Sequence, residues 1–484
     1  MLFRRNNNGR AGISSDATPN DTAAKGGAEA DPYITLGVNV ETGEPFRFPR
    51  RLLGHMHCRG MSGSGKSSLT LVSLVHQLLG VPVFVIDLGG DQNLFHNLKQ
   101  SAERSGKAFR YLTLDQKLHS DNFPPFQTLR GSKLHVTEVC QRLIRSFHLD
   151  YGISYGASYY AAQALAAMLS IASKVFAANP NATLADIDRH LNQPTNKKAF
   201  KDADSIRMNV RFLLEYPQLG SATNPDENLL IERAIEENEV SYFFCPTLDD
   251  PIVAPIVGGM ALATIIHIAS ERAKAGHPRV PIFVVIDEFA EIVGRSLGAL
   301  LAQGRKYGLR FILANQSTSQ LETKDTNLVH AVFENTSIKQ YFTSLGDDVE
   351  VLQSLSKDAI RSLGGSTVQG LSTSVSFRDT IVPSLERDKI LEVSQTFGQS
   401  FFVVNDGSGF RPPVVVQQTH QFDDLSERPM PPRKSSAETL GTAPKAVTAG
   451  RRASSTPDGG FAGRNERIVA AIAKMKALES WELE

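Results

Sequence analysis

A glycine-rich segment near the start of the chain constrains the fold more than any other feature. Residues 60–68 read Gly-Met-Ser-Gly-Ser-Gly-Lys-Ser-Ser and match the pattern G-x-x-x-x-G-K-S. A short strand pattern from His55 to Arg59 precedes the segment, and a helical pattern from Leu69 to Leu79 follows it. A phosphate-binding loop requires this context, because its backbone N–H groups and the helix N-terminus together hold phosphate oxygens.

The loop pattern predicts a role for each of its residues. We expect Lys66 to bridge the β- and γ-phosphates of ATP and Ser67 to ligate Mg²⁺. The expected nucleotide-binding residues of the loop are Gly60, Met61, Ser62, Gly63, Ser64, Gly65, Lys66, Ser67 and Ser68. The alternative is a chance match in a loop rich in Gly and Ser, and the polar residues that end two strands downstream argue against it.

Two apolar runs downstream end in polar residues. The run at 280–286 ends in Asp287 and Glu288, and the run from Leu309 to Ala314 ends in Asn-Gln-Ser. This predicts two neighbouring buried strands with functional groups at their carboxyl ends, where open α/β sheets place ligands. We expect Asp287 to hold the Mg²⁺ shell, partly through water, and Glu288 to polarise the attacking water.

For two other polar residues near these runs, the sequence allows two interpretations each. Gln316 either senses the γ-phosphate or caps a turn. Asp87 ends another apolar run but is followed by Leu, so it is either at the edge of the site or a turn acid. A metal cluster of His55, His57 and Cys58 is disfavoured, because alternation places residues 55 and 57 on one face of the strand and 58 on the other.

The order of the patterns predicts an α/β fold, a P-loop NTPase sheet with an inserted all-α subdomain. The long separation between the loop and Asp287 favours the branch of P-loop ATPases that carries an extra strand between the two motifs. We expect a helix from Asp347 to Leu363, a mobile stretch from Gly364 to Ser376, and a closing hairpin of residues 401–404 and 414–416.

Composition limits the remaining classes. The chain has 484 residues with 51 basic and 51 acidic side chains, so any contact with DNA must come from a local surface. Three scattered cysteines fit a reducing compartment. We find no signal peptide and expect the apolar stretch from Pro251 to Ser270 to be a core helix rather than a membrane span, which predicts a cytoplasmic protein.

Three segments resemble the conjugative coupling proteins of type IV secretion (TraG/TraD/TrwB type), within the FtsK/HerA group of ring-forming motors. They are Ile286 to Ala290, Gly304 to Arg310 and Asn315 to Leu321. The resemblance implies a RecA-like domain, a hexamer, DNA-stimulated ATP hydrolysis by a DNA translocase, and delivery of relaxase-bound DNA to a secretion channel. It places Arg305 where the family has an arginine that reaches the neighbouring subunit's nucleotide, whereas Lys306 and Arg310 fit a solvated basic face.

With this resemblance the expected organisation has five parts. They are a disordered segment at 1–30, a RecA-like domain at 31–135 and 238–425, an inserted all-α domain at 136–237, a disordered linker at 426–463, and an amphipathic tail helix at 464–484 that docks on a partner or on its own ring.

The chain departs from the family because residues 1–50 hold no transmembrane helix. Recruitment to the inner membrane would therefore need a partner. Two alternatives remain: a secretion-assembly ATPase that does not thread DNA, and a nucleotide-gated platform that recruits a relaxase. Glu288 argues against the platform, because a platform needs no carboxylate to activate water.

Overall fold

The structure, a computed structural model, describes residues 32–132, 134–147, 157–199, 204–292, 296–323, 326–342, 346–356, 358–369 and 372–433. The chain divides into a unit that ends at Arg433 and a second unit that starts at Lys434, and every described residue belongs to the first. The segment predicted to be disordered at 1–30 and the tail helix predicted at 464–484 therefore lie outside the described residues.

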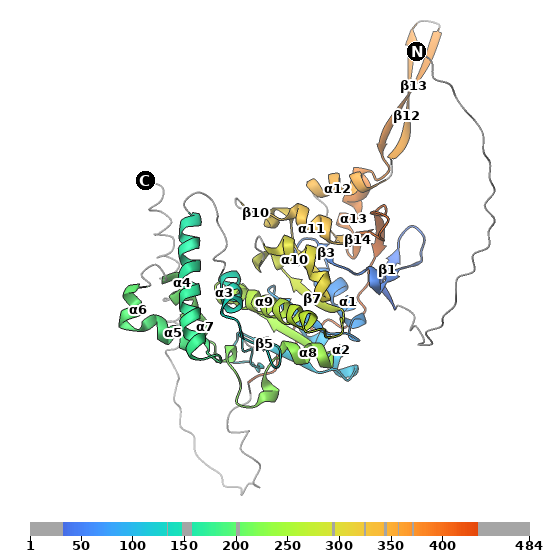
Figure 1. Ribbon diagram of the computed structural model, residues 1–484. Helices are drawn as coiled ribbons and strands as arrows, with labels where there is room; N and C mark the ends of the chain where they lie inside the picture. Colours follow the sequence, from blue (N-terminus) through green and yellow to red (C-terminus); the bar gives the residue numbers. More distant parts are fainter. Residues whose placement is uncertain are drawn as a thin grey trace, which may run out of the picture. The chain divides into compact units, whose positions relative to one another are not determined.

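Within the described residues one large mixed sheet organises the fold (Figure 1). Its strand order is β2-β1-β15-β14-β11-β3-β8-β7-β4-β6-β5. The strands from β11 to β5 in this order are parallel, and β14, β15, β1 and β2 add an antiparallel extension. The strands of the sheet are β1 (Tyr33–Asn39), β2 (Pro45–Pro49), β3 (Met56–Arg59), β4 (Val83–Asp87), β5 (Phe109–Thr113), β6 (Val240–Phe244), β7 (Ile282–Asp287), β8 (Leu309–Asn315), β11 (Ile338–Tyr341), β14 (Gln399–Val404) and β15 (Val414–Gln417).

Strand order confirms two expectations about the motifs. The strands β7 and β8 are parallel neighbours, with Ile286 opposite Leu313. β8 lies between β7 and the loop strand β3, and it is the extra strand predicted between the two motifs. The predicted closing hairpin is also present, because β14 and β15 pair antiparallel. Because β3, β8 and β7 are parallel neighbours, these three strands end at the same edge of the sheet.

Both faces of the parallel part of the sheet are covered. Alternate residues of β4 enter different apolar clusters, Phe84 and Ile86 on one face and Val83 and Val85 on the other. The first face is covered by α3 (Val136–Ser146), α8 (Ile231–Glu237) and α9 (Val253–Lys274), and the second by α1 (Val72–Gln77) and α2 (Gln92–Arg104). Burial on both faces explains why these strands read as continuous apolar runs.

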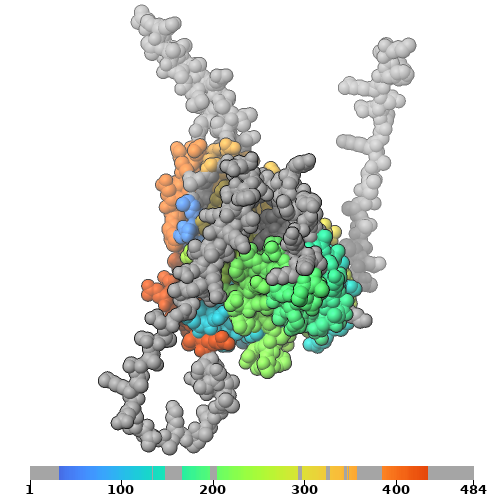
Figure 2. All heavy atoms as spheres, turned by 90° about the vertical axis from the view of Figure 1, so that its left-hand side faces the viewer, coloured from blue at the N-terminus to red at the C-terminus, as the bar shows by residue number. Residues whose placement is uncertain are grey.

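Among the described residues between β5 and β6, the named elements are all helices. They include α3 and α8 together with α4 (Ala157–Ala178), α5 (Leu184–Asn192), α6 (Pro194–Ala199) and α7 (Asp204–Leu214). α4 to α7 group on one side of the sheet, coloured teal to green in Figures 1 and 2. Their apolar side chains join the same cluster as the sheet face, so the insert shares a core with the sheet. The boundaries of the insert as a domain stay a prediction.

α9 is the helix expected in the apolar stretch from Pro251 to Ser270. Among the described helices it passes a length and hydropathy test for a membrane span, and 78% of the tested window is buried inside the structure. Its buried residues pack against β4, η5 (Phe289–Ile292) and α3. The stretch is therefore a core helix, as predicted.

Two expectations about the C-terminal third are wrong. The predicted helix at 347–363 ends early, since α12 spans Asp347–Leu355. The described residues of the predicted mobile stretch, 364–369 and 372–376, instead belong to β12 (Asp358–Gln369) and β13 (Ser372–Pro383), which pair with each other in a separate sheet (Figure 1). Glycines suggested mobility, but the alternating Thr, Val and Phe of residues 373–382 favour strand.

The remaining described elements connect these parts. They are η1 (Arg50–Leu52), η2 (Lys66–Leu71), η3 (Pro217–Leu219), η4 (Pro225–Glu227), α10 (Ser296–Gly304), η6 (Arg305–Tyr307), η7 (Thr318–Leu321), β9 (Glu322–Thr323), β10 (Thr326–Asn327), α11 (Val329–Asn335) and α13 (Arg387–Gln395).

The structured chain continues past the predicted boundary at residue 425. His96 of α2 contacts the carbonyl oxygen of Arg428 at 2.8 Å, and Met430 is buried against the second face of the sheet. The backbone N–H groups of His119 and Arg433 donate to the carbonyls of Pro431 and Lys117. Residues 426–433 are thus a strap along α2 and the segment after β5 rather than the start of a linker, and red atoms lie beside cyan ones in Figure 2.

Candidate functional site

The phosphate loop leaves β3 at the carboxyl edge of the sheet. Gly63 and Gly65 adopt positive φ angles of 76° and 99°, which a side chain disfavours. The chain then enters η2 (Lys66–Leu71), a π-helical turn that continues as α1, so the helix begins three residues earlier than predicted. The loop residues Met61 and Ser62 are exposed. The loop therefore presents its backbone to solvent at a helix N-terminus.

Lys66 lies inside the loop that it is predicted to serve. Its ammonium donates to the carbonyl oxygens of Gly60 and Met61, at 2.7 and 3.3 Å. The side chain is 6% exposed, and no acid pairs with it among the described ion pairs. A lysine that holds only loop carbonyls can turn to phosphate oxygens, which are stronger acceptors because they are charged.

Ser67 and Asp287 meet at the centre of the site. The Ser67 hydroxyl donates to Asp287 Oδ2 at 2.8 Å. Asp287 is buried at the end of β7, and burial raises the pKa of its carboxyl, against which the Ser67 hydrogen bond acts. Together they form a pair of oxygen ligands of the kind that Mg²⁺ prefers.

Glu288 adopts an unusual backbone conformation. Its φ of 53° lies in the left-handed region, and among the described non-glycine residues only Asn238 shares this sign. The Glu288 N–H donates to Asp287 Oδ1 at 3.1 Å. The backbone thus turns left-handed directly after β7, at the residue that is predicted to polarise the attacking water.

Gln316 completes the group. Its Nε2 donates to Glu288 Oε1 at 3.0 Å, and its side chain is exposed. The interpretation of Gln316 as a turn cap is not supported, because Gln320 Oε1 accepts from the N–H groups of Gln316 and Ser317 at 2.9 and 3.1 Å. The structure thus brings together Lys66, Ser67, Asp287, Glu288 and Gln316.

Arg305 does not join this group. It starts η6, before β8, at the amino edge of the sheet, and its side chain is exposed. Its guanidinium lies against Gly54, because a Cβ added at Gly54 would be 2.5 Å from Arg305 Nη2. Gly54 precedes β3, whereas the phosphate loop follows it. Arg305 and the loop of one chain therefore occupy opposite edges.

Asp87 is a buried turn acid beside the site. Its carboxylate accepts the N–H groups of Gly90 and Asp91 at 2.7 and 3.0 Å and the Tyr242 hydroxyl at 2.7 Å. Burial and the adjacent Asp287 raise the pKa of Asp87. Asp87 and Asp287 are register partners in β4 and β7. Asp87 thus sits at the edge of the site and also stabilises the turn, so both sequence interpretations contribute.

The histidines and the cysteine before the loop have separate partners. His55 Nε2 contacts the carbonyl oxygen of Leu301 at 3.0 Å, His57 Nε2 contacts Asn315 Oδ1 at 2.8 Å, and Cys58 donates to Gln340 Oε1 at 3.3 Å. Three different partners disfavour a shared metal, as expected. Sequence reasoning missed the pairing of His57 with Asn315.

Another group of metal-ligand type lies on α3 and α9. Ligand atoms of Glu138, His267 and Glu271 all lie within 4.8 Å of one another. Lys274 donates to Glu271 at 2.7 Å, and Glu138 and Glu271 both raise the pKa of the nearby Arg142, whose pKa is lowered by burial. Since cations of the chain already balance both carboxylates, we interpret this group as an ion cluster.

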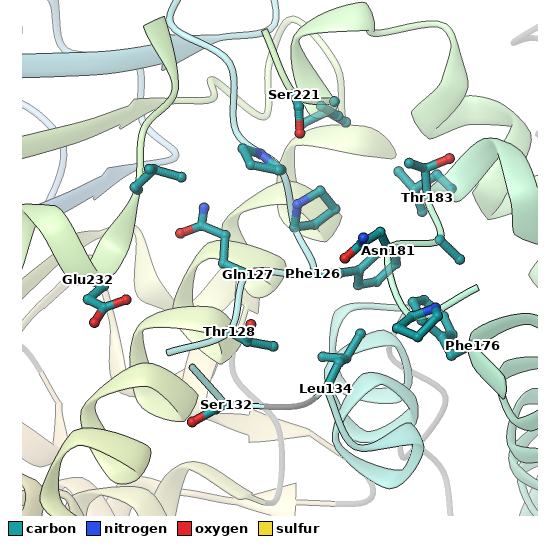
Figure 3. Close-up of a pocket in the computed structure, with 18 of the residues that line it drawn as sticks. Phe126, Gln127, Thr128, Ser132, Leu134, Phe176, Asn181, Thr183, Ser221 and Glu232 are labelled. Carbon is teal, nitrogen blue, oxygen red and sulfur yellow. The ribbon is translucent and has the colours of Figure 1, made fainter. Parts of the chain in front are cut away.

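The insert borders a cavity of about 900 Å³ (Figure 3). Phe126 and Phe176 pack edge to face on its wall, with ring centroids 5.3 Å apart, and Leu134 lies beside them. In this view Ser221 lies at the top and Thr183 at the upper right. None of the predicted site residues lines the cavity, so it is separate from the phosphate loop.

The chain's own residues fit a nucleotide with Mg²⁺. The buried hydroxyl oxygen of Ser64 has no hydrogen-bond partner in the part of the chain that the structure describes. A Cβ at Gly60 would lie 2.6 Å from this oxygen, so the loop is closely packed there. An unpaired hydroxyl, loop N–H groups, Lys66 and the Ser67–Asp287 pair form a donor and ligand set suited to a phosphate chain and a hard cation.

Comparison with protein families gives one match. Residues 281–395 match the family described as "TraM recognition site of TraD and TraG". This range runs from β7 to α13 and contains Asp287, Glu288, Arg305 and Gln316. A sequence comparison with curated proteins finds no match.

Comparison with solved structures gives matches over most of the chain. An unbound form of the bacterial conjugative coupling protein TrwB is 16% identical, with a TM-score of 0.53 over 81% of this chain and 90% of that one. TrwB in complex with ADP and Mg²⁺ is 17% identical, with a TM-score of 0.51 over 80% and 90%. VirB4 of Thermoanaerobacter pseudethanolicus is 12% identical, with a TM-score of 0.53 over 82% and 98%.

These findings confirm the resemblance recognised in the sequence and the predicted α/β fold class. Identities below 20% establish the fold alone, and the family match adds the segment that carries the acid pair. The chain therefore shares its α/β fold with the conjugative coupling protein TrwB, and its residues 281–395 match the family described as "TraM recognition site of TraD and TraG".

Proposed function

We propose that this chain is a Mg²⁺-dependent ATPase that moves DNA as a conjugative coupling protein. The observation that carries the proposal is the constellation at the carboxyl edge of the sheet. Ser67 and Asp287 meet at 2.8 Å, and Gln316 and Glu288 meet at 3.0 Å. A platform that only binds nucleotide would need the first pair but not the second.

The residues divide the work of hydrolysis among them. Bound Mg²⁺ would neutralise charge on the phosphates, with Ser67 as ligand and Asp287 holding its shell. Lys66 and the loop N–H groups bind and orient the phosphates. Glu288 accepts a proton from the attacking water, and the Gln316 amide orients the Glu288 carboxylate towards it. Positioning and charge stabilisation provide most of the rate in such reactions.

Arg305 is proposed to act on a second copy. Its place at the amino edge, opposite the phosphate loop, supports action across a subunit interface. A head-to-tail interface generates a ring when the rotation between neighbours closes, which is what the expected hexamer requires. An arginine from a neighbour stabilises charge on the transferred phosphoryl group and contributes on the order of 10³-fold or more to the rate.

The primary test is ATP hydrolysis by the full chain with and without single- and double-stranded DNA, at low and moderate salt. We expect DNA to raise turnover, and more at low salt, because phosphate contacts weaken as salt rises. Lys66→Ala and Glu288→Gln should abolish the stimulated rate. If no DNA changes the rate of hydrolysis, that result would contradict the translocase and favour the assembly ATPase.

Mixing variants tests the shared site. Arg305→Ala leaves its own pocket intact, and Glu288→Gln leaves its own Arg305 intact. If Arg305 acts in trans, an equal mixture of the two inactive variants regains activity, since about one interface in four combines both intact halves. Lys306→Ala, next along the chain and also exposed, is the matched control and should stay active. A mixture as inactive as its components would contradict a shared site.

The partners and location follow the same proposal. Relaxase-bound DNA and secretion components are the expected partners, and the inner membrane is the expected place of action, through a partner protein. The 281–395 match, described as a TraM recognition site in TraD and TraG, supports a partner contact in this region. Co-purification with relaxosome components, lost on deletion of residues 358–383, would test it.

A further inference from the structure

His57 lies under the catalytic edge and has no role in the mechanism above. It is 6% exposed, in the middle of the loop strand β3. Its Nε2 is 2.8 Å from Asn315 Oδ1, and Asn315 Nδ2 donates to the Ser317 carbonyl at 2.7 Å. Because the Asn315 oxygen accepts, His57 Nε2 carries the hydrogen. Burial lowers the pKa of His57 to about 4, so the ring is neutral at pH 7.

Asn315 is the residue on which the turn carrying Gln316 depends. It is fully buried at the end of β8, and its carbonyl accepts the Gly60 N–H of the phosphate loop at 3.2 Å. Beyond it, Gln320 holds the N–H groups of Gln316 and Ser317. The main chain of Gln316 is therefore fixed on both sides, while its exposed side chain reaches Glu288.

The His57 imidazole also contacts the residue that follows Glu288, the partner of Gln316. Its ring packs edge to face on Phe289, with ring centroids 5.9 Å apart and an interplanar angle of 90°. Phe289 is fully buried and directly follows Glu288, whose backbone is left-handed. One buried side chain thus contacts the residue before Gln316 and the residue after Glu288.

We infer that His57 is a positioning residue that sets the contact between Glu288 and Gln316. Its hydrogen bond orients the Asn315 amide and through it the Gln316 turn, and its ring fixes Phe289 and through it the Glu288 carboxylate. The inference rests on the proposed function, because positioning matters only where the pair acts on water. Misplacement of such a pair by about 1 Å costs on the order of 100-fold in rate.

Two substitutions separate the hydrogen bond from the ring. His57→Phe keeps an aromatic ring beside Phe289 but removes the donor, and His57→Gln restores an amide donor. His96→Phe is the matched control, because His96 is also buried, contacts a carbonyl oxygen through Nε2 at 2.8 Å and packs edge to face on a phenylalanine, but lies on α2.

ATP turnover and the affinity for fluorescent Mg-ADP are measured on the full chain of each variant, with its melting temperature. We expect His57→Phe to lower kcat about 10- to 100-fold while Mg-ADP affinity stays within about threefold, and His57→Gln to regain part of the rate. His96→Phe should show a similar decrease in melting temperature but keep the wild-type kcat. In a Gln316→Ala background, His57→Phe should cause little further loss, because both changes break one unit.

Each outcome decides between the two proposals. Wild-type protein without ATPase activity would contradict the proposed function and this inference with it. An active wild type in which His57→Phe lowers kcat no more than His96→Phe would overturn the inference alone. The inference would also be overturned if His57→Phe lowered Mg-ADP affinity as much as kcat. It would be overturned as well if the loss of kcat in the double variant equalled the product of the losses in His57→Phe and Gln316→Ala, because either result assigns His57 to general stability.

Discussion

The left-handed backbone of Glu288 predicts that this residue weakens the fold while it serves the reaction. A φ of 53° costs a residue with a long side chain about 1 to 2 kcal/mol, whereas Asn tolerates this region. Glu288→Asn should therefore recover that strain. It gives up the bond from Gln316, which is exposed and contributes roughly 0.5 kcal/mol. The expected net gain in the free energy of unfolding is about 1 kcal/mol.

The size of the effect sets the assay. Unfolding entropies of about 2 cal/mol/K per residue mean that ~1 kcal/mol shifts the melting temperature of a unit of this length by only about 1 °C. Differential scanning calorimetry at one scan rate should show a higher melting temperature for Glu288→Asn than for Glu288→Gln, because Gln keeps the backbone strain. Both variants should lose hydrolysis by about 10² to 10⁴, since each removes the general base.

The second left-handed residue supplies a calibration. Asn238 has a φ of 55° at the C-cap of α8, and Asn238→Gln should lower the free energy of unfolding by about 1 kcal/mol without changing turnover. If Asn238→Gln destabilises as expected but Glu288→Asn melts no higher than Glu288→Gln, the left-handed φ of Glu288 does not cost stability and the prediction is wrong.

Two further outcomes follow from the structure. Lys339 is fully buried, and its Nζ lies 4.4 and 3.8 Å from the ring centroids of Phe333 and Phe410. Burial lowers the pKa of Lys339 from 10.5 to about 7. Because the pKa is lower in the folded state than in the unfolded state, the wild-type fold loses stability as pH falls from about 10.5 to 7. The stability of Lys339→Met relative to wild type should therefore be greatest at pH 7 and shrink towards pH 10, which thermal melts at several pH values would measure. A difference in stability that does not change with pH would contradict this. Gly60→Ala would place a Cβ 2.7 Å from Phe342 Cβ, so it should weaken Mg-ADP binding in a fluorescence titration by tenfold or more, whereas equal affinity would show that the loop adjusts.

The sequence predicted what depends on local pattern. Buried parallel strands read as continuous apolar runs, so the acids after residue 286 and the amides after residue 314 could be assigned to neighbouring strand ends. The phosphate loop carries its own context of strand and helix. The family match over 281–395 and the strand order support the same assignments.

Contacts between distant residues could not be predicted in this way. His57 and Asn315 are 258 positions apart, and their hydrogen bond depends on β3 and β8 being neighbours. The left-handed backbone of Glu288 is likewise a feature that no residue pattern encodes. The hairpin at 358–383 was missed because glycines and serines outweighed an alternation that becomes informative once the strands pair.

The last three residues of the loop strand connect the site to the rest of the molecule. His57 contacts Asn315 on β8, Cys58 donates to Gln340 on β11, and the buried Arg59 forms an ion pair with Asp348 on α12. α12 leads into the hairpin of β12 and β13. Since the loop begins at the next residue, any shift of its first turn on phosphate binding acts on all three contacts at once. The Arg59–Asp348 pair is the one of the three that involves α12, the helix before the hairpin. Coupling between nucleotide and a hairpin-bound partner should therefore fall in Asp348→Asn while ATP turnover alone is kept.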